Sequence, residues 1–569
     1  TSMKHNSVRL LLLVSILISV ALALTWLEIP VQAQEVENTL WIAGTLRDQQ
    51  NQPVEAAQVA LIQAEDGEVI YESESQPDGH YTLVVPEGTL ESLEIHIERP
   101  HFKDTRVRIS QDIIETLQSG KPLIIPSIVL DREINLSFWI ATIIFIAVLI
   151  LIATGFLHNT LAALVGASLL YFFSYLGEPL IESAFVFSFQ RSLSYIDWNV
   201  IFLVMGMMIV IAVVEETGVF QWLAFFAYRI SRGKMWLLLP ILMLITGLAS
   251  AFLDNVTTML LMTPITVQIS LSLGVNPLAL LMPLIFASNV IGVSTLVGTP
   301  TNILIGSYGN ISFNDFLQNL TPGVILAFIG LVGYSWFVYR KELGKAQGTS
   351  AVLLKKLEES GQITQPEHLK KAGWVGLGMI LLFIFGEHFH LLPAVTALMG
   401  ATVLMVWIRP NIEEMIDAVD WTTLVFFITL FIVVGGIQEV GLISFIADGI
   451  GRLVGENLVL AIIAVTGLSA MLSMVIANIP FTAAMLPVIG YLTVTIPGAE
   501  SKVLFFCLSV GSAMGGNGSL IGASANLVTA GISEGAGYPI TYKYFLKKGL
   551  PAVLVTVGLA TIWLLYRFS

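Results

Sequence analysis

Two stretches of this chain, one in each hydrophobic half, carry the same polar residues and prolines in the same order. The segment 250–264 reads SAFLDNVTTMLLMTP and the segment 473–487 reads SMVIANIPFTAAMLP, so that a serine, an asparagine and a proline recur at a constant offset of 223 residues. Further along, GTPTN at 298–302 is matched by GASAN at 522–526, at an offset of 224. Polar segments broken by glycine and proline, at corresponding places in two hydrophobic halves, are typical of secondary transporters.

The composition is that of a membrane protein with one polar domain. Of 569 residues, 55% are hydrophobic and 12% are charged, which is about half the charged fraction of an average soluble protein. The net charge of −14 says little about partners, because much of the acid lies between residues 35 and 135. The single cysteine, Cys507, excludes disulfide bonds within the chain and cysteine-based metal sites. We expect the lipid bilayer and a small ion or oxyanion as partners, and no nucleic acid.

The first 34 residues combine a basic start, with Lys4 and Arg9, and an apolar run that begins at Leu10. This pattern fits either a cleaved signal peptide or an uncleaved anchor helix, and both interpretations stay open. In either case the basic end stays inside the cell, so the segment that follows is exported. We therefore expect a multi-pass protein of the plasma (inner) membrane, with a domain at 35–134 on the extracytoplasmic side.

Residues 35–134 alternate polar and apolar positions and carry turn signals, which together predict a small β-sandwich. The motifs GTLRD at 44–48 and DGHYTLVVPEG at 78–88 resemble those of carboxypeptidase-regulatory-like domains. The resemblance implies a module that binds or packs rather than one that catalyses. Its histidines are expected to be surface or structural residues rather than metal ligands: His80, His96 and His101.

Hydrophobic segments from residue 135 onward predict two transport repeats, 135–341 and 372–569, joined by a cytoplasmic linker, 342–371. In the first repeat we expect helical segments at 137–157, 159–177, 199–214, 218–232, 236–253, 256–272, 277–310 and 322–340. In the second repeat we expect them at 373–386, 391–408, 421–437, 441–453, 457–476, 479–494, 502–531 and 549–566. Each repeat thus has one pair of segments interrupted at an asparagine and one segment broken by glycine.

The two interrupted pairs decide the membrane topology. If each pair is a re-entrant hairpin, each repeat crosses the membrane five times, and this odd number inverts the second repeat relative to the first. The basic residues then fall inside the cell, whereas the outside loop predicted at 306–321 has no Lys or Arg. The inside group is Arg229, Arg232, Lys234, Arg340, Lys341, Lys345, Lys355, Lys356, Lys370, Lys371, Lys543, Lys547 and Lys548. Full crossings are the alternative, and we favour hairpins.

The expected fold class is therefore an all-α polytopic membrane protein with an exported β-sandwich. Its core is an inverted repeat of five transmembrane helices each, with two re-entrant hairpins and two broken helices. Backbone away from helix geometry is tolerated at membrane depth only where protein or a water-filled cavity satisfies its polar groups. The four interruptions therefore predict a cavity that suits a small ion or oxyanion.

One carboxylate breaks the symmetry of the repeats, because the counterpart of Asp254 is Ala477. A carboxylate near the bilayer centre costs roughly 2.5–3.5 kcal/mol on insertion scales, so Asp254 is a functional candidate. Partial desolvation disfavours its charged form and a bound cation favours it, which is the physical basis for exchanging a proton against a cation. A second and compatible interpretation is that Asp254 caps the second hairpin helix.

The remaining polar residues at the interruptions are of three kinds. Asparagines at the hairpin tips can cap a helix, coordinate an ion, or both, and serines one turn earlier either coordinate or bond back to carbonyls. Glycines in the broken helices allow close backbone approach, and the asparagines after them can aim amides at a ligand. The expected ion- or substrate-binding residues are Ser250, Asp254, Asn255, Thr257, Gly298, Thr299, Asn302, Ser473, Asn478, Thr482, Gly522 and Asn526. For Na⁺ the candidate ligands are Asp254, Asn255 and Asn478.

Other titratable residues are given structural interpretations. Glu215, Glu216 and Glu439 end apolar helices near the interface and are expected to mark helix ends, with a proton route as the alternative. The run Glu387-His388-Phe389-His390 lies in a predicted short loop without supporting ligands, so we expect no zinc site there. No nucleophile–base pair or phosphate-binding loop accompanies the predicted cavity, so the chain is not expected to be an enzyme.

The motifs FLDNVTT at 252–258, GTPTN at 298–302 and GGNGSLIGASAN at 515–526 resemble those of the ion transporter superfamily. Within it they are similar to the ArsB/NhaD branch, which includes P (pink-eyed dilution) protein-like permeases with a citrate transporter-like domain. The resemblance covers residues 135–569. An exported domain between a first helix and the transport core also resembles the arrangement of the P protein.

This resemblance implies a homodimer in which each protomer has a scaffold subdomain and a moving transport subdomain. It also implies two sodium sites that flank the substrate. The first would use Ser250, Asp254, Asn255, Gly298 and Asn302, and the second would use Ser473, Asn478, Gly522 and Asn526. The chain departs from the branch at 298–302, where GTPTN stands in place of the usual GDPPN, and its hairpin tips lack the Ser-Asn-Thr of carboxylate carriers.

Together these features predict a secondary active ion transporter with elevator-type alternating access. Our first hypothesis is Na⁺/H⁺ antiport, in which Asp254 exchanges a proton for the cation, so that Na⁺ is the one bound ion expected and no cofactor is needed. The alternative is an anion transporter, for arsenite efflux or for Na⁺-coupled uptake of di- or tricarboxylates. An ion channel and a membrane-anchored sensor are further alternatives.

Overall fold

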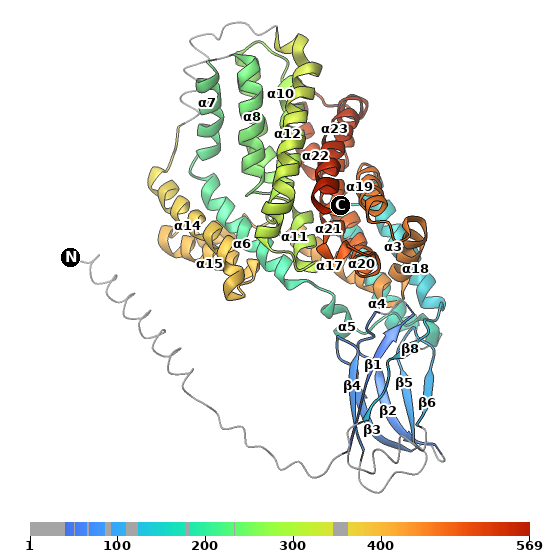
Figure 1. Ribbon diagram of the computed structural model, residues 1–569. Coiled ribbons are helices and arrows are strands. Elements are labelled where there is room, and N and C mark those ends of the chain that lie inside the picture. Colours follow the sequence, from blue (N-terminus) through green and yellow to red (C-terminus); the bar gives the residue numbers. More distant parts are fainter. Residues whose placement is uncertain are drawn as a thin grey trace, which may run out of the picture. The chain divides into compact units, whose positions relative to one another are not determined.

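The computed structural model describes residues 40–49, 52–64, 68–85, 93–109, 123–177, 179, 181–232, 234–344 and 362–569. The signal or anchor helix expected at 1–34 and most of the linker expected at 342–371 lie outside these ranges. The chain divides after Glu133 into two compact units. The described part of the first is built of strands and that of the second of helices (Figure 1).

The strand unit consists of two sheets that share one hydrophobic core. The strands are β1 (Leu40–Asp48), β2 (Gln58–Gln63), β3 (Val69–Glu74), β4 (His80–Val85), β5 (Leu93–Glu98), β6 (Thr105–Arg108), β7 (Leu123–Ile124) and β8 (Ile128–Leu130). In one sheet β1 pairs antiparallel with β4 and parallel with β7 and β8, and the other has the antiparallel order β3-β2-β5-β6. Every second residue of β1 from Ile42 to Asp48 is buried, which is the alternation expected of a strand with one face on a core.

The helical unit begins with the elements of the first repeat. They are α3 (Leu136–Thr154), α4 (Asn159–Phe172), α5 (Phe189–Ser194), α6 (Trp198–Glu215), α7 (Val219–Ser231), α8 (Met235–Ser250), α9 (Asn255–Ser272), α10 (Leu278–Ile291), α11 (Pro300–Tyr308) and α12 (Phe313–Leu343). A π-helical turn, η1 (Phe173–Gly177), follows α4, and short 3-10 turns lie at η2 (Glu182–Ala184) and η3 (Gly292–Ser294). The turn η3 and the residues after it separate α10 from α11, so the expected broken helix is present.

The second half repeats this series. Its elements are α14 (Pro366–Phe385), η4 (Gly386–Phe389), α15 (Pro393–Ile408), α16 (Ile412–Asp417), α17 (Trp421–Glu439), α18 (Leu442–Val454), α19 (Leu458–Ser473), α20 (Asn478–Thr495), η5 (Ala499–Ser501), α21 (Val503–Gly515), η6 (Gly516–Gly518), α22 (Ser524–Gly535) and α23 (Tyr542–Phe568). The pairs α5/α16, α7/α18, α8/α19 and α9/α20 match in length, and the members of each pair begin 223 positions apart. The sequence repeat is thus also a repeat of helices.

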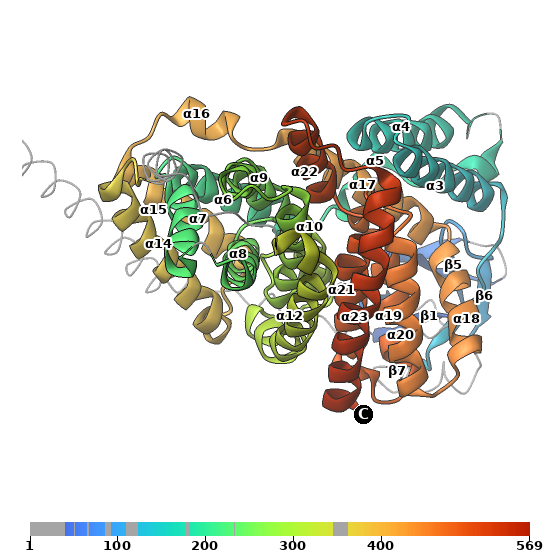
Figure 2. The same cartoon turned by 90° about the horizontal axis from the view of Figure 1, so that it is seen from above.

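The packing of helices crosses between the halves and follows the repeat. The helix α6 packs against α15, and its counterpart α17 packs against α4, the counterpart of α15. Likewise α9 packs against α22 while α20 packs against α11. The last helices of the two halves, α12 and α23, lie side by side (Figure 2). Each half therefore completes the hydrophobic core of the other.

Many of these helices are suited to a bilayer. Eight of them, among the described residues, are long and apolar enough to cross a membrane. They span Leu136–Thr154, Asn159–Gly177, Trp198–Glu215, Phe313–Leu343, Pro366–Phe389, Trp421–Glu439, Asn478–Thr495 and Tyr542–Phe568. Five shorter apolar helices, among them α8, α10 and their counterparts, complete the set.

Some helix boundaries differ from the expectation. α12 begins at Phe313 rather than at 322, because Ser312 and Asp315 form a capping box and Pro322 lies within the helix. Most of the loop predicted at 306–321 is therefore helical. α14 and α23 also start a few residues early, at Pro366 and Tyr542. The expected starts followed the onset of hydrophobicity. The observed first turns of α12 and α23 are instead held by side-chain caps, and α14 starts at a proline without such a cap. The six-residue helices α5 and α16 were not predicted at all.

Candidate functional site

The first tip, residues 251–254, connects α8 to α9. Asp254 is the N-cap of α9. Its Oδ1 accepts hydrogen bonds from the backbone N–H groups of Val256 (2.8 Å) and Thr257 (2.9 Å), and its Oδ2 accepts one from the Thr257 hydroxyl (2.6 Å). The expected capping role of Asp254 is confirmed. The carboxylate is partly buried and lies at the positive end of the α9 dipole.

The second tip, residues 474–477, connects α19 to α20 and lacks such a cap. Ala477 is the N-cap of α20 and offers no side-chain oxygen. Asn478 is buried, and within the described chain its side chain makes no hydrogen bond. The hydroxyl of Thr482, one turn further along the same helix, is fully buried and has no hydrogen-bond partner among the described residues. This tip therefore holds free polar groups and an uncapped helix N-terminus.

The two broken helices show the same contrast at their second halves. Thr299 caps α11 by accepting from the backbone N–H of Asn302 (3.2 Å), and its hydroxyl lies 2.9 Å from that of Thr301. Its counterpart Ala523 precedes α22 and makes no side-chain cap. In the first half the starts of α9 and α11 are therefore each capped by a side-chain oxygen. In the second half the starts of α20 and α22 have no side-chain cap.

The asparagines of the broken helices hold their own loops together. Asn302 Nδ2 donates to the carbonyl oxygens of Val293 (3.0 Å) and Thr295 (2.8 Å). Asn526 Nδ2 donates to those of Gly516 (2.8 Å) and Ser519 (2.9 Å) in the matching way. Both amide hydrogens of each residue are thus used within the loop, and the expected aim of these amides at a ligand is not seen in this arrangement.

Backbone approaches fix each hairpin against the broken helix of its own half. A Cβ at Gly298 would lie 2.3 Å from the carbonyl oxygen of Gly292 and 3.0 Å from that of Ser250. A Cβ at Gly522 would lie 2.7 Å from the carbonyl oxygen of Gly516 and 2.9 Å from that of Ser473. The expected close approach at both glycines is present, and it brings each hairpin serine next to the glycine of the same half.

Hydroxyl groups add to these contacts. Thr295 donates to the carbonyl oxygen of Ala251, and its counterpart Ser519 donates to that of Met474. The two tip serines themselves lie close to the preceding half of the broken helix. Ser250 Oγ accepts from Ser288 Oγ at 3.0 Å, whereas Ser473 Oγ donates to the carbonyl oxygen of Ser512 at 2.6 Å. The second serine thus bonds to backbone, one of its two expected roles.

Side chains also join the halves, and most of these links were missed by the sequence analysis. Asn255 Nδ2 donates to Asn289 Oδ1 (2.6 Å), and Asn289 Nδ2 donates to the Oδ1 atoms of Asn517 (2.8 Å) and Asn526 (3.2 Å). On the other side, Ser509 Oγ donates to Asn302 Oδ1 (2.6 Å). These bonds bring the first tip to the second broken helix. Within the described residues no hydrogen bond connects Asn255 to Asn478.

The sequence repeat gives no signal for Asn289 and Ser509. Neither has a polar counterpart that would mark it as part of the repeat, since Ile285 and Ala513 stand at the matching places with the offset of 224. Each lies within a long apolar run. A single buried asparagine in such a run was the available signal, because buried polar groups in apolar helices require a partner.

The helix-end glutamates differ from one another. Glu439 is buried, and it accepts hydrogen bonds from Arg191 Nε (3.3 Å) and from the Tyr195 hydroxyl. Both donors come from the unpredicted helix α5 and the residue after it. Glu216, the counterpart of Glu439, is largely exposed. Glu439 thus forms an ion pair that ties the end of α17 to the other half.

A cavity of about 550 Å³ lies beside the first broken helix. Its lining includes Leu296 and Ile303, which flank Thr299 and Asn302 in sequence, and also Glu387 and His390. The other walls come from α6, α14 and α15. The cavity therefore lies between α11 and the helices α14 and α15, with α6, which also contacts α11, as a further wall, and it reaches the loop that carries the candidate residues.

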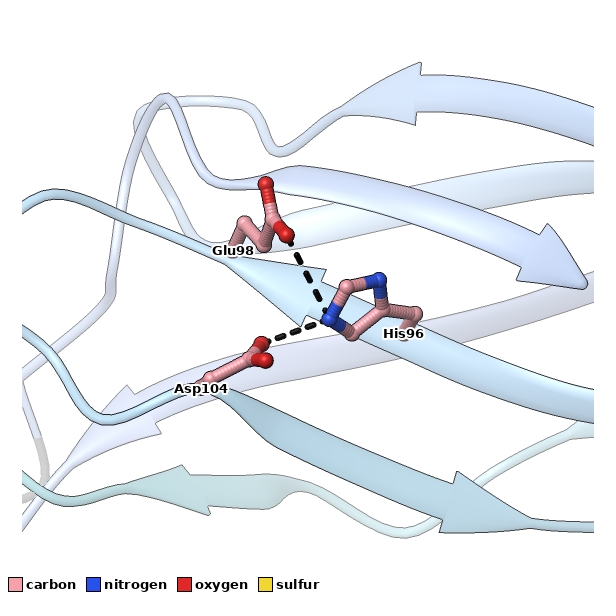
Figure 3. Close-up of side chains that lie close together, drawn as sticks. All are labelled: His96, Glu98 and Asp104. Atoms are coloured by element: carbon pink, nitrogen blue, oxygen red, sulfur yellow. Dashed lines mark hydrogen bonds and ion pairs between the residues drawn. The ribbon is translucent and has the colours of Figure 1, made fainter. Parts of the chain in front are cut away.

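One histidine of the strand unit lies between two carboxylates (Figure 3). His96 Nε2 is 2.6 Å from Asp104 Oδ1 and 3.5 Å from Glu98 Oε1. The two acidic side chains are each more than half exposed. Of the described residues, these three form the one group whose donor atoms lie close enough for a shared metal ion. A hydrogen bond between the His96 ring and the Asp104 carboxylate is sufficient to explain this geometry.

The chain has close relatives among membrane transporters. Residues 146–502 match the CitMHS family, described as citrate transporter. An uncharacterized transporter of Mycobacterium tuberculosis is 36% identical over 430 residues, which cover 75% of this chain and 98% of that protein. An uncharacterized transporter of Synechocystis is 30% identical over 74% of this chain and 96% of its own length. The human P protein is 29% identical over 81% of this chain and 64% of its own length.

Two solved structures show a more distant similarity. The YdaH transporter of Alcanivorax borkumensis matches 64% of this chain and 84% of its own, with 15% identity and a TM-score of 0.46. The MtrF transporter of Neisseria gonorrhoeae matches 75% of this chain and 94% of its own, with 12% identity and a TM-score of 0.48. Such scores are too low to transfer details. The sequence matches are sufficient: the chain belongs to the CitMHS citrate transporter family, with the P protein among its relatives in the ion transporter superfamily, and is a multi-pass membrane transporter.

Proposed function

We propose that the protein is a secondary active ion transporter in which Asp254 binds the coupling cation. The observation that carries this proposal is chemical. In the two tips and the two broken-helix loops, Asp254 is the single ionisable side chain, and it lies partly buried at a helix start. A carboxylate kept at such a position in an apolar helix bundle is a functional site by default.

The movement we propose is an elevator-type alternating access within an inverted repeat. The packing of α8 on α9 and of α19 on α20 supports two re-entrant hairpins. The cavity between α11 and the helices α14 and α15 supports a boundary between a moving and a fixed subdomain. The remaining parts of this proposal are a homodimer and an extracytoplasmic strand unit, which follow from the resemblance and from the charge distribution.

Na⁺/H⁺ antiport is the mode that we propose first. Asp254 can hold either a proton or, together with neighbouring oxygens, a Na⁺ ion, and the two compete for one carboxylate. Oxygen ligands are what such hard cations prefer. Asn255 and Asn478 are the neighbouring candidates. The exchange needs no cofactor other than Na⁺ itself.

The test is proton flux in proteoliposomes. With a Na⁺ gradient imposed across the membrane, a trapped pH dye should report proton movement against the Na⁺ flow, and Asp254→Asn should abolish it. Asparagine also caps helices, so this variant should still fold. Asp420→Asn is the matched control, because Asp420 caps α17 through Thr423 with the same type of bonds outside the tips. Absence of Na⁺-linked proton flux in the wild type would rule out antiport.

The second candidate is cation-coupled transport of a small anion such as citrate. The observation that favours it is the bare start of α20 with the unpartnered Thr482 hydroxyl, because uncapped N–H groups at a helix N-terminus attract anions. The description of the matching family as citrate transporter supports the same candidate. In this mode the cation at Asp254 would accompany the anion instead of exchanging against a proton.

Thermal unfolding with citrate, succinate or arsenite, each with and without Na⁺, separates the candidates. Thr482→Val keeps the shape of the side chain and removes the hydroxyl, so it should cancel a stabilisation by the anion without lowering stability in its absence. Thr493→Val is the control on the same helix, where the hydroxyl donates to the carbonyl oxygen of Ile489. A citrate effect that is equal in all three proteins would remove Thr482 from the site.

A further inference from the structure

The buried asparagine Asn289 has no role in the repeat pattern, yet it makes the central link of the site. It is 1% exposed and lies on α10. Its carboxamide contacts three other asparagines, which come from the start of α9, from η6 and from the start of α22. The repeat places Ala513 at the corresponding position of α21. The second half therefore has no equivalent of the link that Asn289 makes in the first half.

The amide orientation of Asn526 determines which atom donates and which accepts in the hydrogen bonds of this asparagine group. Asn526 places its nitrogen against the carbonyl oxygens of Gly516 and Ser519, and a carbonyl oxygen can only accept. Asn526 must therefore present its Oδ1 to Asn289. The atom of Asn289 that faces it must be the nitrogen, which also donates to Asn517 Oδ1.

The same logic extends to the first tip. With its nitrogen directed at the second half, Asn289 presents its Oδ1 to Asn255, so the facing atom of Asn255 must be the nitrogen (2.6 Å). The side-chain oxygen Oδ1 of Asn255 then lies on the side of the carboxamide that faces away from Asn289. No hydrogen bond from the described residues reaches that oxygen, and Asn255 keeps 5% of its surface exposed. Asn255 directly follows Asp254.

We propose that Asn289 is a positioning residue that orients the side chain of Asn255. In this orientation Asn255 Oδ1 joins the Asp254 carboxylate as a ligand of the coupling cation. This inference rests on the proposed cation role of Asp254 and deepens it. The cation need not touch Asn289. Removing a hydrogen-bond partner that fixes the orientation of a metal ligand typically changes the metal affinity by about 10–100-fold.

The experiment measures how thermal unfolding of the full-length, detergent-solubilised chain depends on Na⁺, with choline chloride to keep the ionic strength constant. Asn289→Ala removes the acceptor, so Asn255 is free to rotate, and the Na⁺ concentration for half-maximal stabilisation should rise about tenfold or more. In its protonated form, the side chain of Asn289→Asp retains an oxygen that accepts from Asn255 and an O–H group that can donate toward Asn517 or Asn526, so its half-maximal concentration should stay closer to that of the wild type. A residue that acts by packing alone would not separate these two variants.

The control is Asn276→Ala, which removes an asparagine just before the same helix whose side-chain Oδ1 accepts from the backbone N–H of Leu278 (3.0 Å). Its Na⁺ dependence should equal that of the wild type. If the wild type responds to Na⁺ and Asn289→Ala has the same half-maximal concentration, the positioning role is refuted while the cation site stands. If both Asn289 variants are weakened equally, the orientation argument is wrong as well.

Two further outcomes are defined. If Asn289→Ala does not fold, Asn255→Ala tests the same oxygen directly, and an unchanged Na⁺ dependence in that variant overturns the proposal. If the wild type shows no response to Na⁺ or to pH, the cation role of Asp254 fails, and the inference about Asn289 fails with it.

Discussion

A methyl group at Gly298 should disconnect the first hairpin from its broken helix. The Cβ of alanine there would lie 2.3 Å from the carbonyl oxygen of Gly292, whereas ordinary van der Waals contact begins at 3.4 Å. It would also lie 3.0 Å from the Cα of Ala251 and from the carbonyl oxygen of Ser250. All three neighbours are backbone atoms, so no side chain can rotate out of the way.

To restore contact distance, residue 298 must therefore move about 1 Å away from Gly292 within the broken helix and about 0.4 Å away from the hairpin. Overpacking of this kind costs typically about 1–3 kcal/mol of folding stability. The same movement would displace Asp254 and Asn302 relative to each other. Where reacting or binding groups are positioned by fixed geometry, a misplacement of about 1 Å can cost on the order of 100-fold in rate. We expect a modest loss of stability and a large loss of transport.

The assay compares thermal unfolding in detergent with flux in proteoliposomes for Gly298→Ala, Gly522→Ala and Gly531→Ala. At Gly522 the shortest distance is 2.7 Å, so its substitution should have the same sign and a smaller effect. Gly531 lies in α22 and has no atom within 4 Å of a Cβ. Its substitution should be neutral or stabilise the helix by up to about 1 kcal/mol. Equal flux in Gly298→Ala and wild type would show that the close approach does not position the site.

Three other substitutions test separate parts of the structure. Asp254→Ala should lower stability by about 1 kcal/mol in the absence of Na⁺ through loss of the cap, whereas Asp254→Asn should not, as measured by thermal unfolding. Glu439→Gln should destabilise the protein by about 3 kcal/mol in chemical denaturation, because it removes the buried negative charge that is paired with the Arg191 guanidinium, and Glu216→Gln should have little effect in the same measurement. Burial raises the pKa of Tyr81 to about 12, so as the pH rises the unfolded chain loses the phenol proton before the folded chain does. The free energy of unfolding should therefore fall between pH 10 and pH 12, by up to about 1.4 kcal/mol per pH unit. Tyr81→Phe should remove this pH dependence in thermal unfolding at pH 9, 10 and 11.

The repeat made much of this architecture predictable from sequence. Hydrophobic runs located most of the long helices, and the aligned serines, asparagines and glycines located the interruptions, because polar groups in an apolar bundle need local partners. The cap by Asp254 and the close approach at Gly298 and Gly522 followed from residue type alone. These are local properties, which a sequence records directly.

What the sequence did not reveal are contacts made across the chain. The ion pair between Arg191 and Glu439 joins residues 248 positions apart, and Asn289 meets Asn526 over 237 positions. Neither pair is repeated in the other half, so the symmetry that exposed the interruptions gave no signal for them. The polar first turn of α12 was missed because hydrophobicity marks where a helix enters the lipid, not where its hydrogen bonds begin.

The two halves share a backbone geometry and differ in what that geometry offers. A helix N-terminus attracts an anion through N–H groups that lack a partner. Asp254 and Thr299 occupy those groups in the first half with oxygen atoms of their own, and under the proposed cation role of Asp254 these oxygens are candidate cation ligands. Ala477 and Ala523 offer no such oxygen in the second half. There Pro480, which has no N–H, stands at the position that matches Thr257, and the N–H of Asn526 donates to the carbonyl oxygen of Ala523 (3.1 Å). In our proposal the first half, with its two side-chain caps, binds the cation, and the second half, without them, takes the anion of the second candidate function. Asn289, which has no counterpart in the second half, would orient Asn255 on the cation side.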